Sequence, residues 1–150
     1  MLNGGDRTVA VIDAASRSRT ATVRLAPPIP NVEDVPAGMA VDPISHSVDI
    51  SRRSCDHAAV VIDDPSRGMR RLPVGHSTVD VAADPAANIP YTAANPDTST
   101  GSAIGVTTEI ATASGDVGGE PTQLGLNPIT RTPSVGCNNA EFGAVTRPQR

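Results

Sequence analysis

Four aspartates recur at the ends of short apolar segments, and together they are the best candidates in this chain for binding a ligand. They are Asp13, Asp42, Asp63 and Asp84. Carboxylates on several neighbouring loops could bind a cation where the loops meet. Each aspartate also ends a strand-like segment or begins a turn, where its side chain can accept hydrogen bonds from the backbone ahead of it. We favour this structural interpretation and assign no catalytic, cofactor-binding or metal-binding residue.

The histidines and cysteines do not form a recognisable metal motif. His46, His57 and His76 are far apart in the sequence, and no two share a strand face. Because a metal site needs several ligands converging on one ion, we expect three solvated imidazoles in loops. Cys55 and Cys137 are 82 residues apart and neither has a CxxC partner, which argues against a zinc site. No cofactor is expected.

Arginine is the other concentrated residue type, and the chain contains no lysine. Five arginines fall between residues 52 and 71: Arg52, Arg53, Arg67, Arg70 and Arg71. Acidic residues lie among them, and no aromatic residue is present there to stack on a base. The net charge is −4 and the pI is about 5.2. We therefore expect a solvated, partly ion-paired surface and no nucleic-acid partner.

Other known signals are missing from the sequence. It has no Gly-x-Ser-x-Gly, His-Glu-x-x-His, P-loop or dinucleotide-binding glycine pattern. No run of eighteen apolar residues predicts a membrane span. The N-terminus lacks the features of a secretory signal, so a cytoplasmic location is expected if the N-terminus is native.

The elements that must position these residues are predicted to be short β-strands. The 14 prolines and 13 glycines favour many turns, and only Tyr91 and Phe142 are aromatic. A core must therefore be built from Val, Ile and Ala. The predicted fold class is all-β.

A repeat of 42 to 43 residues organises the chain. The turns Asp42-Pro43, Asp84-Pro85 and Asn127-Pro128 are spaced 42 and 43 residues apart, and each follows a short apolar stretch. Proline presets the backbone of such a turn, and Asp or Asn before it bonds forward. The clearest copy runs from Thr78 to Tyr91 as strand, turn and strand.

About four short strands per repeat are typical of a β-propeller blade. We predict antiparallel four-stranded blades, about three in all. The expected divisions are a partial blade at 8–25, blades at 38–74 and 78–113, a partial blade at 122–146, a Pro-rich loop at 26–34 and a tail at 147–150. The two cysteines would then lie in loops two repeats apart, too far for an intrachain disulfide.

Several of these segments resemble the YVTN β-propeller repeat. They are Val11-Ile12-Asp13, Val61-Ile62-Asp63, Pro73-Val74-Gly75 and Val81-Ala82-Ala83-Asp84-Pro85. The resemblance implies a binding or scaffolding role, often outside the cytoplasm. Related propellers also include lactone hydrolases and cofactor-dependent dehydrogenases.

The sequence also departs from that repeat. No copy keeps Tyr-Val-Thr-Asn, and Pro90 and Pro133 fall in second strands, where each removes a hydrogen-bond donor from a non-edge strand. Gly105 and Gly143 weaken the third strands in a similar way. The copies therefore look decayed.

The functional prediction is a non-enzymatic propeller module, truncated or decayed, that binds a protein or small ligand or acts as a scaffold. Unpaired strand edges would allow self-association. One alternative is an enzyme of the propeller lactonase or dehydrogenase type. The other is a remnant reading frame without activity.

Overall fold

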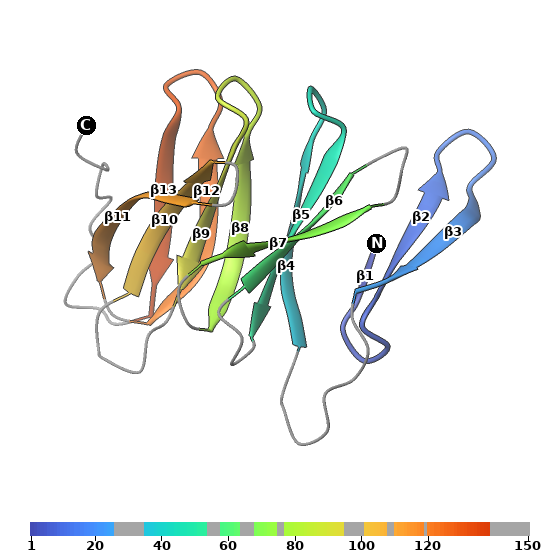
Figure 1. The fold of residues 1–150 in the computed structure, drawn as a ribbon, viewed down its shortest axis with the longest axis horizontal. Helices are drawn as coiled ribbons and strands as arrows, with labels where there is room; N and C mark the ends of the chain where they lie inside the picture. The colour runs from blue at the N-terminus through green and yellow to red at the C-terminus, as the bar shows by residue number, and fades with distance from the viewer. Residues whose placement is uncertain are drawn as a thin grey trace.

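A computed structural model describes most of the chain. The described residues are 1–25, 35–53, 58–63, 68–74, 77–94, 101–107, 110–118 and 120–138, with only the backbone described in 101–107 and 110–118. Thirteen β-strands lie within these residues (Figure 1). They are β1 (Leu2–Asn3), β2 (Thr8–Asp13), β3 (Ser18–Arg24), β4 (Val35–Asp42), β5 (Ser47–Arg53), β6 (Ala58–Asp63), β7 (Met69–Pro73), β8 (Thr78–Asp84), β9 (Ile89–Ala94), β10 (Gly101–Thr107), β11 (Ile110–Gly118), β12 (Pro121–Asn127) and β13 (Thr132–Cys137).

These strands form four small antiparallel sheets in chain order. Sheet A is β1-β2-β3, sheet B is β4-β5-β6-β7, sheet C is β8-β9-β10-β11 and sheet D is β12-β13. Neighbouring sheets lie side by side, because β1 contacts β4, β4 contacts β8, and β8 contacts β12 (Figure 1). The prediction of an all-β chain of short antiparallel strands is confirmed.

Five hairpins share one turn geometry. In each, the last residue of one strand pairs with the residue five positions later: Asn3↔Thr8, Asp13↔Ser18, Asp42↔Ser47, Asp84↔Ile89 and Asn127↔Thr132. The fourth of the intervening residues has a positive φ between 53° and 56°: Arg7, Arg17, His46, Asn88 and Arg131. Residues other than glycine adopt this conformation uncommonly, and asparagine tolerates it best. The same backbone is therefore built at five places by different side chains.

The first strands of sheets B, C and D share a second feature. Each has a register shift at the corresponding place, between Pro36 and Met39, between Thr78 and Asp80, and between Pro121 and Gln123. A bulge of this kind bends a strand and increases its twist. Strands β4, β8 and β12 are thus structural equivalents, as the 42- to 43-residue period predicts.

Aliphatic side chains fill the boundaries between sheets. Val9 and Leu25 of the sheet A segment pack with Ile50, Val60 and Ile62 of sheet B. A second cluster comprises Ala59, Val61, Leu72 and Val74 on and beside sheet B. A third joins Ala82 and Ala93 of sheet C to Leu124 of sheet D, with Tyr91 packed against it. The core is built from Val, Ile, Leu and Ala, as the low aromatic content requires.

The structure differs from the predicted divisions at two places, before residue 8 and before residue 38. Leu2–Asn3 forms a strand, so sheet A has three strands and not the two expected in 8–25. Strand β4 begins at Val35, three residues before the expected start of the next division. The Pro-rich loop 26–34, the segment 141–146 with Gly143, and the tail 147–150 lie outside the described residues.

Pro90 and Pro133 lie on β9 and β13, the second strands of their sheets, as expected. Pro90 shortens the pairing of β9 with β10. Strand β9 pairs with β10 only from Tyr91 onward, whereas the equivalent pairing of β5 with β6 begins two residues earlier, at Ser47. At Pro90 the strand therefore pairs with β8 alone. This matches the rule that proline occurs at strand edges. A register irregularity also follows Gly105 in β10.

Candidate functional site

The three repeat turns lie at the ends of β4, β8 and β12. The Asp42 carboxylate accepts hydrogen bonds from the N–H groups of Ile44 and Ser45, at 2.8 and 3.2 Å. The Asp84 carboxylate accepts one from the Ala86 N–H at 3.1 Å. These bonds hold the turn backbone in place. The prolines that follow the two acids, Pro43 and Pro85, lie inside these turns.

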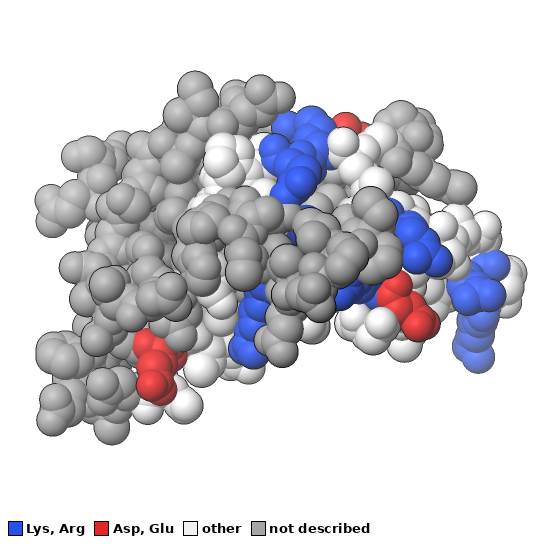
Figure 2. Space-filling view, turned by 60° about the horizontal axis from the view of Figure 1, so that its bottom comes forward, with Lys and Arg blue, Asp and Glu red and all other residues white. Residues whose placement is uncertain are grey.

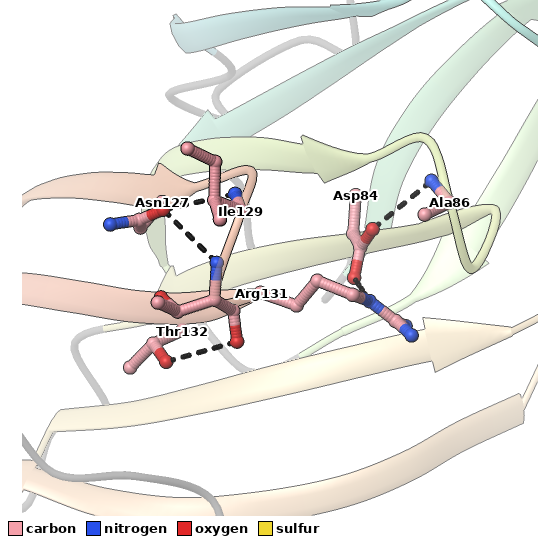
Figure 3. Close-up of polar contacts among 7 residues, drawn as sticks. Asp84, Ala86, Asn127, Ile129, Arg131 and Thr132 are labelled. Atoms are coloured by element: carbon pink, nitrogen blue, oxygen red, sulfur yellow. Dashed lines mark hydrogen bonds and ion pairs between the residues drawn. The ribbon is translucent and has the colours of Figure 1, made fainter.

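The third turn uses an amide in the same way. The Asn127 side-chain oxygen accepts hydrogen bonds from the N–H groups of Ile129 and Thr130 at 3.0 and 3.1 Å (Figure 3). Pro128 lies in this turn, directly after Asn127. An amide oxygen thus takes the place of a carboxylate oxygen. At this turn the geometry requires an acceptor and not a charge.

One ion pair connects consecutive repeats. The Arg131 Nε donates a hydrogen bond of 2.8 Å to Asp84 Oδ2 (Figure 3). The Asp84 side chain is 2% exposed and that of Arg131 is 46% exposed. The hydrogen bond and charge of Asp84 raise the pKa of the Arg131 guanidinium. The turn residue with positive φ in sheet D therefore covers the buried acid of sheet C.

The corresponding place between sheets B and C contains no arginine from the turn. Asn88 is the positive-φ residue there, and it lines a cavity of about 20 Å³ with Asp42, Asp49 and Arg70. This volume is about that of a single water-sized probe. The position that carries a cation in one repeat thus carries a neutral amide in the previous one.

Asp49 is the most perturbed acid among the described residues. It lies on β5 and is 4% exposed. Burial, together with the negative charges of Asp42 and Asp63, raises its pKa to about 6, although Arg70 opposes the change. For Asp42 itself, burial raises the pKa, but the hydrogen bonds from Ile44 and Ser45 outweigh burial and lower it.

The four recurring acids do not all converge on one point, although Asp42 and Asp63 both lie close enough to Asp49 to raise its pKa. Asp13 lies in an exposed turn, where it accepts a hydrogen bond from the Ser16 N–H, while Asp42 and Asp84 are buried at separate sheet boundaries. Within the described part of the chain, no three His, Cys, Asp or Glu side chains are grouped as metal ligands. His46 is exposed in its turn. His57, His76 and Cys55 lie outside the described residues. The expectation that Cys55 and Cys137 form no disulfide therefore stays a prediction.

The arginine-rich segment is not wholly a surface. Arg52 is buried, at 3% exposed, so the expectation of a solvated side chain is wrong for this residue. It lies on β5, which is in contact with β8 of the next sheet. Arg70 lies 3.8 Å from Asp63, which is an ion pair of the expected kind. On the face drawn in Figure 2, basic side chains form separate groups with acidic ones among them.

Polar contacts connect β8, the first strand of sheet C, to strands of both neighbouring sheets. Thr78 Oγ1 of β8 accepts a hydrogen bond from the Arg52 N–H at 3.0 Å and donates one to the Arg52 carbonyl at 2.8 Å. Asp80 Oδ2 of β8 accepts a hydrogen bond from the Leu124 N–H of β12 at 2.8 Å. Strand β8 is thus attached to β5 on one side and to β12 on the other.

Gly38 permits a close approach between β4 and β8. A Cβ at this position would collide with the Asp80 carboxylate and would lie 3.0 Å from the Asp80 Cα. The bulge of β4 therefore needs glycine where the equivalent positions in β8 and β12 carry Asp80 and Gln123. The sequence period alone does not show this requirement.

A second concave region lies on sheet A, and the sequence prediction missed it. Eight residues line a pocket of about 580 Å³: Asn3, Gly5, Asp6, Arg7, Thr8, Arg19, Thr22 and Arg24. Strand pairing brings Arg24 opposite Thr8 and Arg19 opposite Ile12. Only the register of β2 against β3 places these arginines near the turn that carries Arg7.

Taken together, the described residues define an all-β protein of several small antiparallel sheets, with structural turns at the sheet boundaries. None of the described residues forms a helix long and apolar enough to cross a membrane. No protein-family model matches the sequence, and no curated protein matches it either.

The fold is similar to a solved structure of Kuenenia stuttgartiensis hydrazine synthase. The TM-score is 0.63 at 16% sequence identity, and the match covers 78% of this chain. That protein contains a β-propeller. This chain matches 33% of the length of the solved chain, and at this identity the similarity concerns the fold alone.

Proposed function

We propose that this chain is a β-propeller-type repeat module that acts in binding or scaffolding and does not catalyse a reaction. The three complete or partial repeats after sheet A would be blades, with β4, β8 and β12 as their innermost strands. The similarity to part of a propeller-containing protein supports this arrangement. So does the repeated combination of a bulge and an Asx turn in all three strands.

One observation carries the functional part of the proposal. Four buried or half-buried polar side chains at the sheet boundaries bond to the backbone: Asp42 and Asp84 hold turns, Thr78 bonds to Arg52, and Asp80 bonds to Leu124. Groups engaged in this way stabilise the structure and are not positioned to transfer protons to a substrate. The recurring acids therefore serve the scaffold.

Unfolding of the full chain tests this proposal. Because each sheet boundary is buried and polar-bonded, we expect urea to unfold sheets B, C and D in one transition, followed by far-UV circular dichroism. Hydrogen exchange should show the strongest protection in β4 and β8. Separate transitions for the sheets would contradict a coupled module, and a coil-like spectrum in buffer would instead support a remnant reading frame.

A further inference from the structure

Sheet A has one apolar face and one polar face. Val9 pairs with Val23, and both pack toward Ile50 of sheet B. The next pair along the strands, Thr8 with Arg24, points to the opposite face because side chains alternate along a strand. This opposite face contributes to the pocket of about 580 Å³, which lies within the size range of small-molecule sites.

The side chains that line the pocket are charged or polar, apart from Gly5, and their net charge is positive. The lining has three guanidinium groups, from Arg7, Arg19 and Arg24, and one carboxylate, from Asp6. Among the described residues, none forms an ion pair with these three arginines. No apolar residue lines the pocket. Its chemistry therefore suits a small, polar anion.

Arg7 provides an independent indication of a missing partner. Its Nη1 atom is shielded from solvent, and it has no hydrogen-bond partner among the described residues. A buried N–H group without an acceptor is unfavourable and is rare in native proteins. The Arg7 main chain is held in place, because Arg7 has a φ of 53° and its carbonyl accepts a hydrogen bond from the Leu25 N–H. A ligand oxygen would satisfy this nitrogen if the Arg7 side chain turned it toward the pocket.

The Thr8 hydroxyl group can donate a hydrogen bond to a ligand in the pocket. Asn3 Nδ2 donates a hydrogen bond of 3.3 Å to Thr8 Oγ1, which leaves the Thr8 hydroxyl proton for another acceptor. Thr22 brings a second hydroxyl group to the same lining. The Asp6 carboxylate could accept a hydrogen bond from a ligand hydroxyl. A guanidinium group can donate two parallel hydrogen bonds to two oxygens of a phosphate, and hydroxyl groups can donate further hydrogen bonds to it.

We propose that this pocket binds the phosphate group of a small phosphorylated polyol, with Arg7, Arg19 and Arg24 as its cationic partners. A polyol fits the remaining volume, which is lined by hydrogen-bonding groups. Aromatic stacking residues, which a nucleic acid strand would require, do not line the pocket. The inference concerns sheet A alone, so cooperative unfolding and phosphate binding can succeed or fail separately.

Isothermal titration of the full chain with glycerol 2-phosphate, inorganic phosphate and glycerol tests the proposal at constant ionic strength. We expect saturable binding of both phosphates and none of glycerol. Tighter binding of the ester identifies a phosphorylated molecule as the ligand, and equal binding identifies free phosphate. Arg24→Gln should weaken binding about tenfold or more, since it removes a charge-assisted hydrogen bond.

Arg17→Gln is the matched control. Arg17 lies in the next turn of sheet A, also with positive φ, but does not line the pocket. We expect it to bind phosphate as the wild type does. Arg7→Gln should also weaken binding, and Arg24→Gln keeps the test available if Arg7→Gln does not fold. Equal weakening by Arg17→Gln and Arg24→Gln, or no saturable binding by the wild type, would overturn the proposal.

Discussion

Replacing Asp49 by asparagine should stabilise the protein at neutral pH and remove part of the pH dependence of its stability. Asp49 is 4% exposed on β5, and among the described residues none donates a hydrogen bond to its carboxylate. Burial and the charges of Asp42 and Asp63 raise its pKa from 3.8 to about 6. An asparagine has nearly the same shape and carries no charge to desolvate.

The size of the effect follows from this pKa. A carboxyl group with a higher pKa in the folded protein stabilises the fold fully below its unfolded pKa, near 3.8, and this contribution is lost as the pH rises through about 6. Each pKa unit corresponds to about 1.4 kcal/mol, so ionised Asp49 costs about 3 kcal/mol above pH 6. Typical domains are stable by only about 5–15 kcal/mol.

Urea unfolding followed by circular dichroism, from about pH 4 to pH 8, measures this cost. Relative to wild type, Asp49→Asn should gain about 3 kcal/mol at pH 7 and almost nothing at pH 4. Asp6→Asn changes an exposed carboxyl and serves as the control. If the stability difference between wild type and Asp49→Asn stayed constant over this pH range, it would refute the argument that ionisation of the buried Asp49 carboxyl destabilises the fold.

Three further substitutions test contacts between sheets, each measured by chemical or thermal unfolding. Gly38→Ala should destabilise by about 1–3 kcal/mol, because β8 approaches the Gly38 backbone too closely for a methyl group. Thr78→Val should cost about 2–3 kcal/mol by removing the two buried hydrogen bonds between the Thr78 hydroxyl and the Arg52 backbone, while Thr78→Ser, which keeps the hydroxyl, should cost less. Arg131→Gln should lower the melting temperature by exposing Asp84 without its ion-pair partner, and this loss should shrink in about 1 M salt. A loss that does not depend on salt would show that packing, and not charge, is what Arg131 contributes.

Local turn chemistry explains how much of the fold could be predicted from sequence. Asp or Asn before proline determines a turn within four residues, so the 42- to 43-residue period was visible before any packing was known. The side chains of Asp42 and Asn127 then hold these turns through bonds to nearby N–H groups. Strand Leu2–Asn3 was missed because two residues carry no alternation signal.

The buried acid could not be predicted because it depends on tertiary packing. In Ser47–Arg53, the alternation of Val48 and Ile50 predicts that Asp49 faces solvent. Sheet C instead covers the second face of sheet B, so both faces of β5 are buried. The arginine pocket escaped prediction for a similar reason, since only strand register brings Arg24 across from Thr8.

Differences between equivalent positions, and not the shared motif, are therefore where ligand-specific chemistry should be sought. Asp49 corresponds to Tyr91 and Ser134 in the following repeats, so only the boundary between sheets B and C carries a buried acid at this place. Asn88 and Arg131 differ in the same way at the turns. A feature that every repeat keeps must serve the structure that every repeat builds. The repeat structure does not require a charge that one repeat alone carries, such as that of Asp49. Its ionised form destabilises the fold, so the reason for its presence must be sought at the boundary between sheets B and C.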